Sequence, residues 1–208
     1  MRTTHAESIL LLSKERPYFR VSDAEQAGAP RVALTRLVRG GQIERVSRGL
    51  YRDANAPMSE HEELLKVAVQ MRKGVFCLFS ALRFFHIETH LERGIWLAVP
   101  PQYKPPKITP SKLYYARLSG AAFSSGIETH VVNGLQIRVY GVAKTVADCF
   151  RFHRRIGFQV ALNALRQAWI SNRLDIEELL HYAKILQVEE VLHPYLASLI
   201  WHKRTESP

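Results

Sequence analysis

Residues 30–52 read PRVALTRLVRGGQIERVSRGLYR, and this stretch decides the fold of the N-terminal part of the chain. Pro30 suits the first turn of a helix. The apolar residues that follow recur at the spacing of one helical face: Leu34, Leu37 and Val38. Two glycines at 40–41 end that helix. The short extended segments 42–46 and 49–52 then predict a hairpin.

The residues before this stretch predict two more helices. The first covers 4–15, where apolar residues again follow helical spacing. The second covers 21–28, with Ser22 as its cap and Glu25 three residues later, as in a capping box. Three helices followed by a two-stranded hairpin are typical of a winged helix-turn-helix, whose third helix enters the DNA major groove.

Charge is concentrated in the same stretch. The 208 residues carry a net charge of +10. The segment 31–52 holds six arginines and one acid, Glu44, so its own net charge of +5 is half of the charge of the chain. A solvated surface normally mixes both signs of charge, whereas this one does not, so the pattern favours DNA over the alternative of a merely solvated face. The predicted DNA-binding residues are Arg31, Val32, Thr35, Arg36 and Arg39 on the helix and Arg45, Arg48 and Arg52 on the wing.

Composition excludes several protein classes. With 47% hydrophobic residues, 11 Gly and 10 Pro, the chain is neither collagen-like nor intrinsically disordered. Cys77 and Cys149 stand far apart among apolar neighbours, so we expect buried free thiols and no disulfide framework. The sequence lacks an uncharged apolar run of about twenty residues. We therefore expect a cytoplasmic protein that does not bind membranes.

The rest of the chain predicts an α+β domain. A polar stretch at 53–57 is the expected linker, which gives a winged helix-turn-helix domain at 1–54 and a C-terminal domain at 58–208. Two helices are predicted near the start of this second domain, at 59–72 with Ser59 in a capping box and at 81–86 with Ser80 as the cap.

Strands and further helices follow. Residues 75–78 form a short apolar run. Strands are predicted at 94–99, 113–117, 127–132 and 135–140, and the last two flank Asn133-Gly134, a strong hairpin signal. Four helices close the chain, at 142–152, 157–171, 176–186 with Asp175 as the cap, and 189–202. The prediction is therefore a small, mostly antiparallel sheet with a C-terminal helical cluster.

Catalytic motifs are hard to find. His86 and His90 have the spacing of two metal ligands on a helix, but no third ligand stands nearby, so structural histidines are favoured. Lys144 and Asp148, four residues apart, fit either a phosphate-handling pair or an intrahelical ion pair, and we favour the ion pair. We predict no catalytic residue, no metal and no cofactor.

A second basic region lies in the C-terminal part. Its predicted members are Lys104, Lys107, Lys112, Arg151, Arg154 and Arg155. These residues either form a solvated surface, extend the DNA footprint across phosphates, or bind an acidic or RNA-bearing partner. The sequence leaves these alternatives open.

The N-terminal segments resemble a known family. Leu10-Leu11, Val21-Ser22, the stretch 34–43 and the stretch 44–52 are similar to the N-terminal domain of AbiEi-type antitoxins, the transcriptional regulators of type IV toxin–antitoxin systems. The run Arg48-Gly-Leu-Tyr51 is the most diagnostic part of this resemblance.

The C-terminal segments resemble the same family. The similar features are Ser80-Ala-Leu followed by His86, the strand end Ile137-Arg-Val-Tyr140, and Lys144-Thr145 with Asp148 three residues later. The family usually has an acidic residue before the Lys/Arg-Thr pair. This chain has Ala143 there, so no role of that acid is carried over.

The resemblance implies a function. Proteins of this family repress their own operon by binding inverted repeats in double-stranded promoter DNA through the N-terminal domain. Their C-terminal domain counters a partner nucleotidyltransferase toxin, with which they need not form a stable complex. For this chain we expect a monomer in solution and two copies on DNA. The alternative from another class is a nucleic-acid-processing enzyme that the winged helix delivers to DNA.

Overall fold

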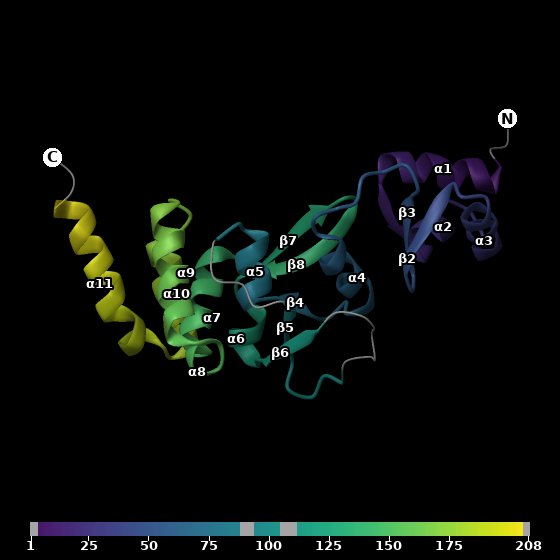
Figure 1. The fold of residues 1–208 in the computed structure, drawn as a ribbon. Coiled ribbons are helices and arrows are strands. Elements are labelled where there is room, and N and C mark those ends of the chain that lie inside the picture. The colour runs from purple at the N-terminus through teal and green to yellow at the C-terminus, as the bar shows by residue number, and fades with distance from the viewer. Residues whose placement is uncertain (1–3, 88–93, 105–111, 206–208) are drawn as a thin grey trace. The chain divides into compact units, whose positions relative to one another are not determined.

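The structure is a computed structural model that describes residues 4–87, 94–104 and 112–205 (Figure 1). The chain folds into two compact units. The first unit contains the chain up to Arg72 together with residues 129–137, and the second contains most of the chain from Lys73 onward. The domain boundaries expected from the sequence, 1–54 and 58–208, stay a prediction.

The first unit contains four helices and three strands among the residues that the structure describes before Lys73. In chain order they are α1 (His5–Glu15), β1 (Tyr18–Arg20), α2 (Val21–Gln26), α3 (Arg31–Arg39), β2 (Ile43–Ser47), β3 (Leu50–Asp53) and α4 (Glu62–Gln70). The strands form an antiparallel sheet in the order β1-β3-β2. The three predicted helices and the hairpin are therefore present, and β1 is a strand that the sequence did not predict.

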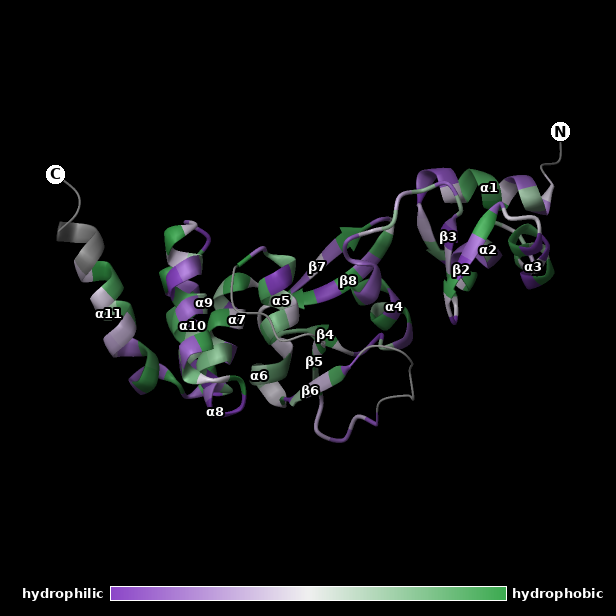
Figure 2. Cartoon of the chain, viewed as in Figure 1, coloured by the Kyte–Doolittle hydropathy of each residue, from purple (hydrophilic) through white to green (hydrophobic). Residues whose placement is uncertain are grey.

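The core of the first unit comes from the residues that face inward on these elements. Ile9 of α1, Ala24 of α2 and Leu34 and Leu37 of α3 are buried together with Phe19 and Ile43. Burial of the leucine, isoleucine and phenylalanine side chains stabilises the fold by about 1.5–3 kcal/mol each. The apolar face predicted for the third helix, with Leu34 and Leu37, therefore packs α3 against the rest of the unit. Figure 2 shows hydrophobic and hydrophilic residues side by side along α3.

The first two helices of the first unit begin in different ways. Thr4 caps α1 in a capping box with Glu7. The predicted cap of the second helix, Ser22 with Glu25, is wrong, because α2 begins at Val21 directly after β1. The Asp23 carboxylate instead accepts a hydrogen bond of 2.7 Å from the main-chain N–H of Arg20. The cap differs from the prediction because β1 ends at Arg20 and the helix follows it directly, so Ser22 already lies inside the helix.

The start of α4 also differs from the prediction. The helix begins at Glu62, three residues later than expected, and the Ser59 hydroxyl accepts a hydrogen bond from the N–H of His61 outside the helix. Tyr18 fixes this segment, because its hydroxyl donates to Glu62 at 2.7 Å and accepts from the N–H of Ser59 at 3.1 Å. A tertiary contact from β1 therefore replaces the predicted capping box.

The remaining chain supplies a five-stranded sheet. Its strands are β4 (Val75–Phe76), β5 (Ile95–Val99), β6 (Leu113–Arg117), β7 (Ile127–Val132) and β8 (Leu135–Tyr140), in the order β6-β5-β4-β8-β7. The predicted α+β class is confirmed. The prediction of a mostly antiparallel sheet needs correction, because β4 pairs with β8 and β5 with β6 in parallel. Parallel pairing requires long crossover connections, which hydrophobic patterning does not reveal.

Helices accompany the sheet. They are α5 (Leu78–Phe84), α6 (Gly120–Ser124), α7 (Val142–Arg151), α8 (His153–Ile156), α9 (Phe158–Ile170), α10 (Ile176–Leu186) and α11 (Glu189–Thr205). The core of the second unit gathers apolar residues of α5, α7, α9 and α10 with those of the strands. In α7 every residue from Ala143 to Phe150 is buried, so this helix lies inside the unit. The C-terminal helical cluster is confirmed, and Asp175 caps α10 as predicted.

Two local predictions in this part of the chain have opposite outcomes. Asn133 and Gly134 have φ angles of 49° and 87°, the left-handed conformation that a two-residue hairpin turn of this type requires, so that prediction is confirmed. Ser80 is not a helix cap, because α5 begins at Leu78 and includes it. Its buried hydroxyl accepts a hydrogen bond of 2.8 Å from the main-chain N–H of Trp96, which ties α5 to β5.

The cysteines and the lengths of the helices can be compared with the sequence predictions. Cys77 and Cys149 are buried free thiols, and burial raises the pKa of both. Among the described residues, each helix is too short or too polar to cross a membrane.

Candidate nucleic-acid interface

The solvent side of α3 carries the predicted DNA-binding residues of the third helix. Arg31, Thr35, Arg36 and Arg39 are exposed, and Val32 is 62% exposed although it is apolar. The opposite side of the helix is fixed by buried Leu34 and Leu37. A nine-residue helix held by one face thus presents three arginines, a threonine and a valine on the other, with no acid in its own sequence.

The wing presents two of its three predicted arginines. Arg45 lies on β2 opposite Tyr51 of β3, and Arg48 lies exposed in the turn between the strands. Arg52 lies opposite Glu44, on the other face of the hairpin, since successive residues of a strand alternate in direction. It forms an ion pair with Glu44, and its side chain is only 11% exposed. The structure therefore does not bring Arg52 to the face that carries Arg45.

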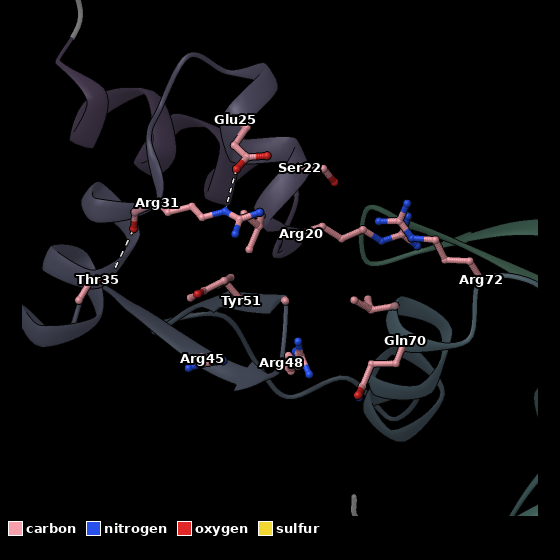
Figure 3. Close-up of a pocket in the computed structure, with 13 residues that line it drawn as sticks. Arg20, Ser22, Glu25, Arg31, Thr35, Arg45, Arg48, Tyr51, Gln70 and Arg72 are labelled. Carbon is pink, nitrogen blue, oxygen red and sulfur yellow. Dashed lines mark hydrogen bonds and ion pairs between the residues drawn. The ribbon is translucent and has the colours of Figure 1, made fainter. Parts of the chain in front are cut away.

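A concave surface connects the helix and the wing. It is an open hollow of about 940 Å³ within the first unit, which we name the arginine hollow (Figure 3). Its charged lining residues are Arg20, Arg31, Arg45, Arg48, Arg72 and Glu25. Five guanidinium groups against one carboxylate make it an anion-attracting site.

Two of these arginines were not predicted from the sequence. Arg20 ends β1 and Arg72 follows α4, so they are 52 positions apart in the chain. The sequence gives only a faint signal for them, since Arg72 stands next to Lys73 at the end of a predicted helix. Their membership in the same site depends on tertiary packing. Of the predicted residues, Arg31, Thr35, Arg45 and Arg48 line the hollow, while Val32, Arg36 and Arg39 lie exposed elsewhere on α3.

The one acid of the arginine hollow already has a partner. Glu25 Oε1 lies 2.9 Å from Arg31 Nε, and the two side chains are 46% and 77% exposed. An exposed ion pair of this kind contributes about 0–1 kcal/mol. Figure 3 shows the pair at one side of the hollow, away from Arg72.

The second basic region has different surroundings. Arg155 donates a 2.7 Å hydrogen bond to the carbonyl of Tyr115, and its guanidinium lies 4.7 Å from the centre of the Trp96 ring. Arg151 donates to the carbonyl of Leu186 at 3.3 Å. These two arginines therefore connect elements of the second unit.

The remaining residues of that region differ in their surroundings. Lys112 Nζ lies 5.2 Å from the centre of the Tyr114 ring. Lys104 and Arg154 are exposed, and Lys107 lies outside the described residues.

The predicted ion pair of α7 is present, but it is buried. Lys144 Nζ lies 2.6 Å from Asp148 Oδ1, and both side chains are fully inaccessible to solvent. The ammonium also lies 4.1 Å from the centre of the Tyr140 ring. Burial raises the pKa of Asp148 to about 6, and the Lys144 charge opposes that shift. A substrate cannot touch this pair in its present position, so it does not act as a phosphate-handling site.

The histidine pair gives no metal site in the described residues. His86 is exposed just after α5, and His90 lies outside the described residues. Among the residues that the structure places, no three of His, Cys, Asp and Glu lie close enough to hold a metal ion.

The family comparison concerns the part of the chain that carries the arginine face. Residues 7–52 match the family model described as "Transcriptional regulator, AbiEi antitoxin". The N-terminal segment is similar to AbiEi-type regulator domains. The match includes α3, β2 and β3 as far as Arg52, so the resemblance predicted from these residues is confirmed. The family consists of antitoxins that are transcriptional regulators.

A solved structure extends the likeness beyond the AbiEi-type domain. The crystal structure of the RV2827C protein from Mycobacterium tuberculosis superimposes with a TM-score of 0.55 over 88% of this chain and 72% of that one. The two sequences are 16% identical, so the likeness concerns the fold alone. No curated protein is a significant match to the sequence.

Proposed function

We propose that the chain is a DNA-binding autorepressor and the antitoxin of a type IV toxin–antitoxin pair. The observation that carries the proposal is the exposed, acid-free face of α3, which adjoins a wing and a hollow lined by arginines inside an AbiEi-type regulator domain. DNA is the polyanion that a helix-turn-helix with such a face is suited to bind.

The proposal assigns different roles to helix and wing. In the major groove, Arg31 and Arg36 would contact guanine edges in the bidentate way that guanidinium permits. Val32, exposed and apolar, would contact a thymine methyl group. Arg45 and Arg48 on the wing would contact backbone phosphates, which position the protein without reading sequence.

Binding requires little rearrangement of the helix face. Arg31 must break its ion pair with Glu25 before it contacts DNA. That exposed ion pair contributes only about 0–1 kcal/mol to stability. Arg52 is excluded from this proposal, because Glu44 neutralises it on the other face of the hairpin.

One such domain reads only a short half-site. We therefore propose that a protein monomeric in solution binds as two copies to an inverted repeat in its own promoter. The half-sites would then lie about one helical turn, or a multiple of it, apart. This spacing places the two recognition helices on the same side of the duplex.

The antitoxin part of the proposal assigns the countering of a nucleotidyltransferase toxin to the C-terminal domain. It is supported by the family that residues 7–52 match. We propose no catalytic role for the chain. Lys144 and Asp148, whose spacing also fits a phosphate-handling pair, form a buried ion pair with each other.

Electrophoretic mobility shift with the protein's own upstream DNA tests the first part. We expect a shifted complex that survives an excess of unrelated duplex, and two steps of binding on an intact inverted repeat. Mutation of one half-site should remove one step. Equal affinity for the promoter and for a scrambled duplex would refute sequence-specific repression.

Co-expression tests the second part. The chain should restore growth of cells that express a nucleotidyltransferase encoded beside its own gene. Arg36→Ala should lose repression and keep this protection, because the two activities are assigned to different domains. If the intact chain gives no protection, the antitoxin proposal fails while the DNA proposal stands.

A further inference from the structure

Two arginines of the arginine hollow lie together, and neither forms an ion pair within the described residues. Arg20, the last residue of β1, and Arg72, just after α4, both line the hollow, and Figure 3 shows their guanidinium groups side by side. Arg20 is half-buried and Arg72 is exposed. Two like charges in proximity repel each other unless an anion is placed between or beside them.

The acid nearest to this pair acts on Arg20 through its charge but forms no ion pair with it. Asp23 is the acid nearest in sequence to Arg20, and its carboxylate is engaged as the helix cap by the main-chain N–H of Arg20. Within the described residues, neither Arg20 nor Arg72 forms an ion pair, and the buried Nε of Arg20 has no hydrogen-bond partner. Burial lowers the pKa of the Arg20 guanidinium, the Asp23 charge opposes that shift, and the charge of Arg72 adds to it.

Guanidinium groups in such a position suit one class of ligand. A phosphate oxygen pair accepts two parallel N–H donors from one guanidinium, and such charge-assisted bonds are roughly twice as strong as neutral ones. Arg72 is exposed and Arg20 is half-buried, so an oxyanion can reach the pair although the Nε–H of Arg20 is enclosed. The pair therefore lacks the partner that its chemistry requires.

We propose that Arg20 and Arg72 form a phosphate clamp at one end of the arginine hollow. The inference rests on the proposed DNA-binding function for the source of the phosphate. The same hollow is lined by Arg31, Arg45 and Arg48, so a DNA strand that contacts those side chains passes next to the clamp. The clamp adds β1 and the end of α4 to a footprint that the sequence placed only on α3 and the wing.

Salt-dependent DNA binding provides the first test. Affinities of the full chain for its promoter and for an unrelated duplex of equal length are measured by fluorescence anisotropy across a salt series. Arg20→Gln and Arg72→Gln should weaken both duplexes by the same factor and reduce the salt slope by about one. Lys73→Gln is the matched control, because Lys73 is exposed, adjoins Arg72 in sequence and is not among the residues found to line the hollow. It should keep the wild-type slope.

A titration without DNA distinguishes the two sources of phosphate. The arginine Nε–H signals of the ¹⁵N-labelled chain are followed by NMR while inorganic phosphate or ADP is added. Shifts that disappear in Arg72→Gln assign the clamp to a free phosphate compound. The absence of shifts, combined with the reduced salt slope, assigns it to the DNA backbone. Arg72 is exposed, so its variant remains informative if Arg20→Gln fails to fold.

The clamp and the proposed function can fail separately. If both variants match Lys73→Gln in salt slope and in the titration, the clamp is refuted while DNA binding stands. If the wild-type chain binds neither duplex, the proposed function fails. The NMR titration then decides the clamp alone: shifts at the two arginines support it, and their absence overturns it.

Discussion

Arg48 in the first unit and Arg155 in the second are both exposed arginines in acid-poor stretches of sequence, yet their guanidinium groups have different surroundings. Arg48 lies on the wing at the rim of an open hollow. Arg155 donates to the carbonyl of Tyr115 and lies over the ring of Trp96. The same residue type thus lines an open hollow in one unit, where we propose that it binds DNA, and packs against neighbouring groups in the other. A count of positive charge along the sequence cannot separate these uses.

The largest expected effect concerns a buried charge of the second unit. Lys144→Met leaves the Asp148 carboxylate without its partner in a site closed to solvent. Loss of one partner of a buried pair costs about 3–5 kcal/mol, which should appear in the free energy of unfolding from urea denaturation at pH 8. The double variant Lys144→Met with Asp148→Leu should recover most of that loss. A single variant as stable as the wild type would show that the pair is not structural.

The same carboxyl group predicts a pH dependence. Its pKa in the folded protein, about 6, lies above the ordinary value of 3.8, so the folded state holds the proton more tightly than the unfolded state. The contribution of Asp148 to stability is therefore complete below pH 4 and falls as the pH rises through 6. Because the Lys144 charge lowers the pKa of Asp148, its removal raises that pKa above 6, so the loss caused by Lys144→Met should shrink as the pH falls from 8 towards 6. A loss that stays constant from pH 8 to pH 4 would contradict the assignment.

DNA recognition should respond most to the helix face. Arg36→Ala should weaken operator binding by about 1–3 kcal/mol and relax the preference at one base pair, while the unfolding free energy stays within about 0.5 kcal/mol. Competition binding against single-base operator variants measures both effects. An unchanged base preference would remove Arg36 from the recognition surface.

The opposite pattern is expected for Arg155. Replacement by alanine removes a hydrogen bond and a cation–π contact, so unfolding should become easier by about 1–2 kcal/mol while promoter affinity is unchanged. Arg154→Ala is the matched control: this neighbour is exposed, and its replacement should alter stability by less than about 0.5 kcal/mol. Lost promoter affinity in Arg155→Ala at full stability would place the second basic region in the DNA footprint.

The smallest effect is expected at the arginine whose placement differs most from the sequence prediction. Arg52→Ala should leave the salt slope of DNA binding unchanged, because Glu44 holds the guanidinium on the other face of the hairpin. Arg48→Ala should reduce the slope by about one. Equal slopes in the two variants would mean that the hairpin meets DNA with both faces.

These contrasts show which parts of the molecule local sequence could predict. The helix stripe of Leu34 and Leu37 and the turn at Asn133-Gly134 follow from spacing and from backbone conformation, and both are present. Ser59 and Ser80 fit cap patterns equally well, but their hydroxyls have other partners. Such partners come from residues distant in the chain, or from a helix that begins elsewhere, and a local pattern does not contain them.

The candidate site shows the same limit. The arginines of α3 and of the wing could be predicted, since one continuous segment of sequence holds them. Arg20 and Arg72 could not, because only the packing of β1 and α4 in one unit brings them to the same hollow. Arg52 could not be excluded either, because its pairing with Glu44 depends on strand register.

The most direct measurement compares two triple variants of equal charge change on the protein's own promoter. One replaces Arg31, Arg36 and Arg48 by alanine, and the other replaces Arg151, Arg154 and Arg155. The first should abolish specific binding in a mobility shift, and the second should bind within about twofold of the wild type at a temperature where it is folded. Equal loss of binding in both variants would contradict the division of the arginines into a DNA-binding set and a set outside the DNA footprint.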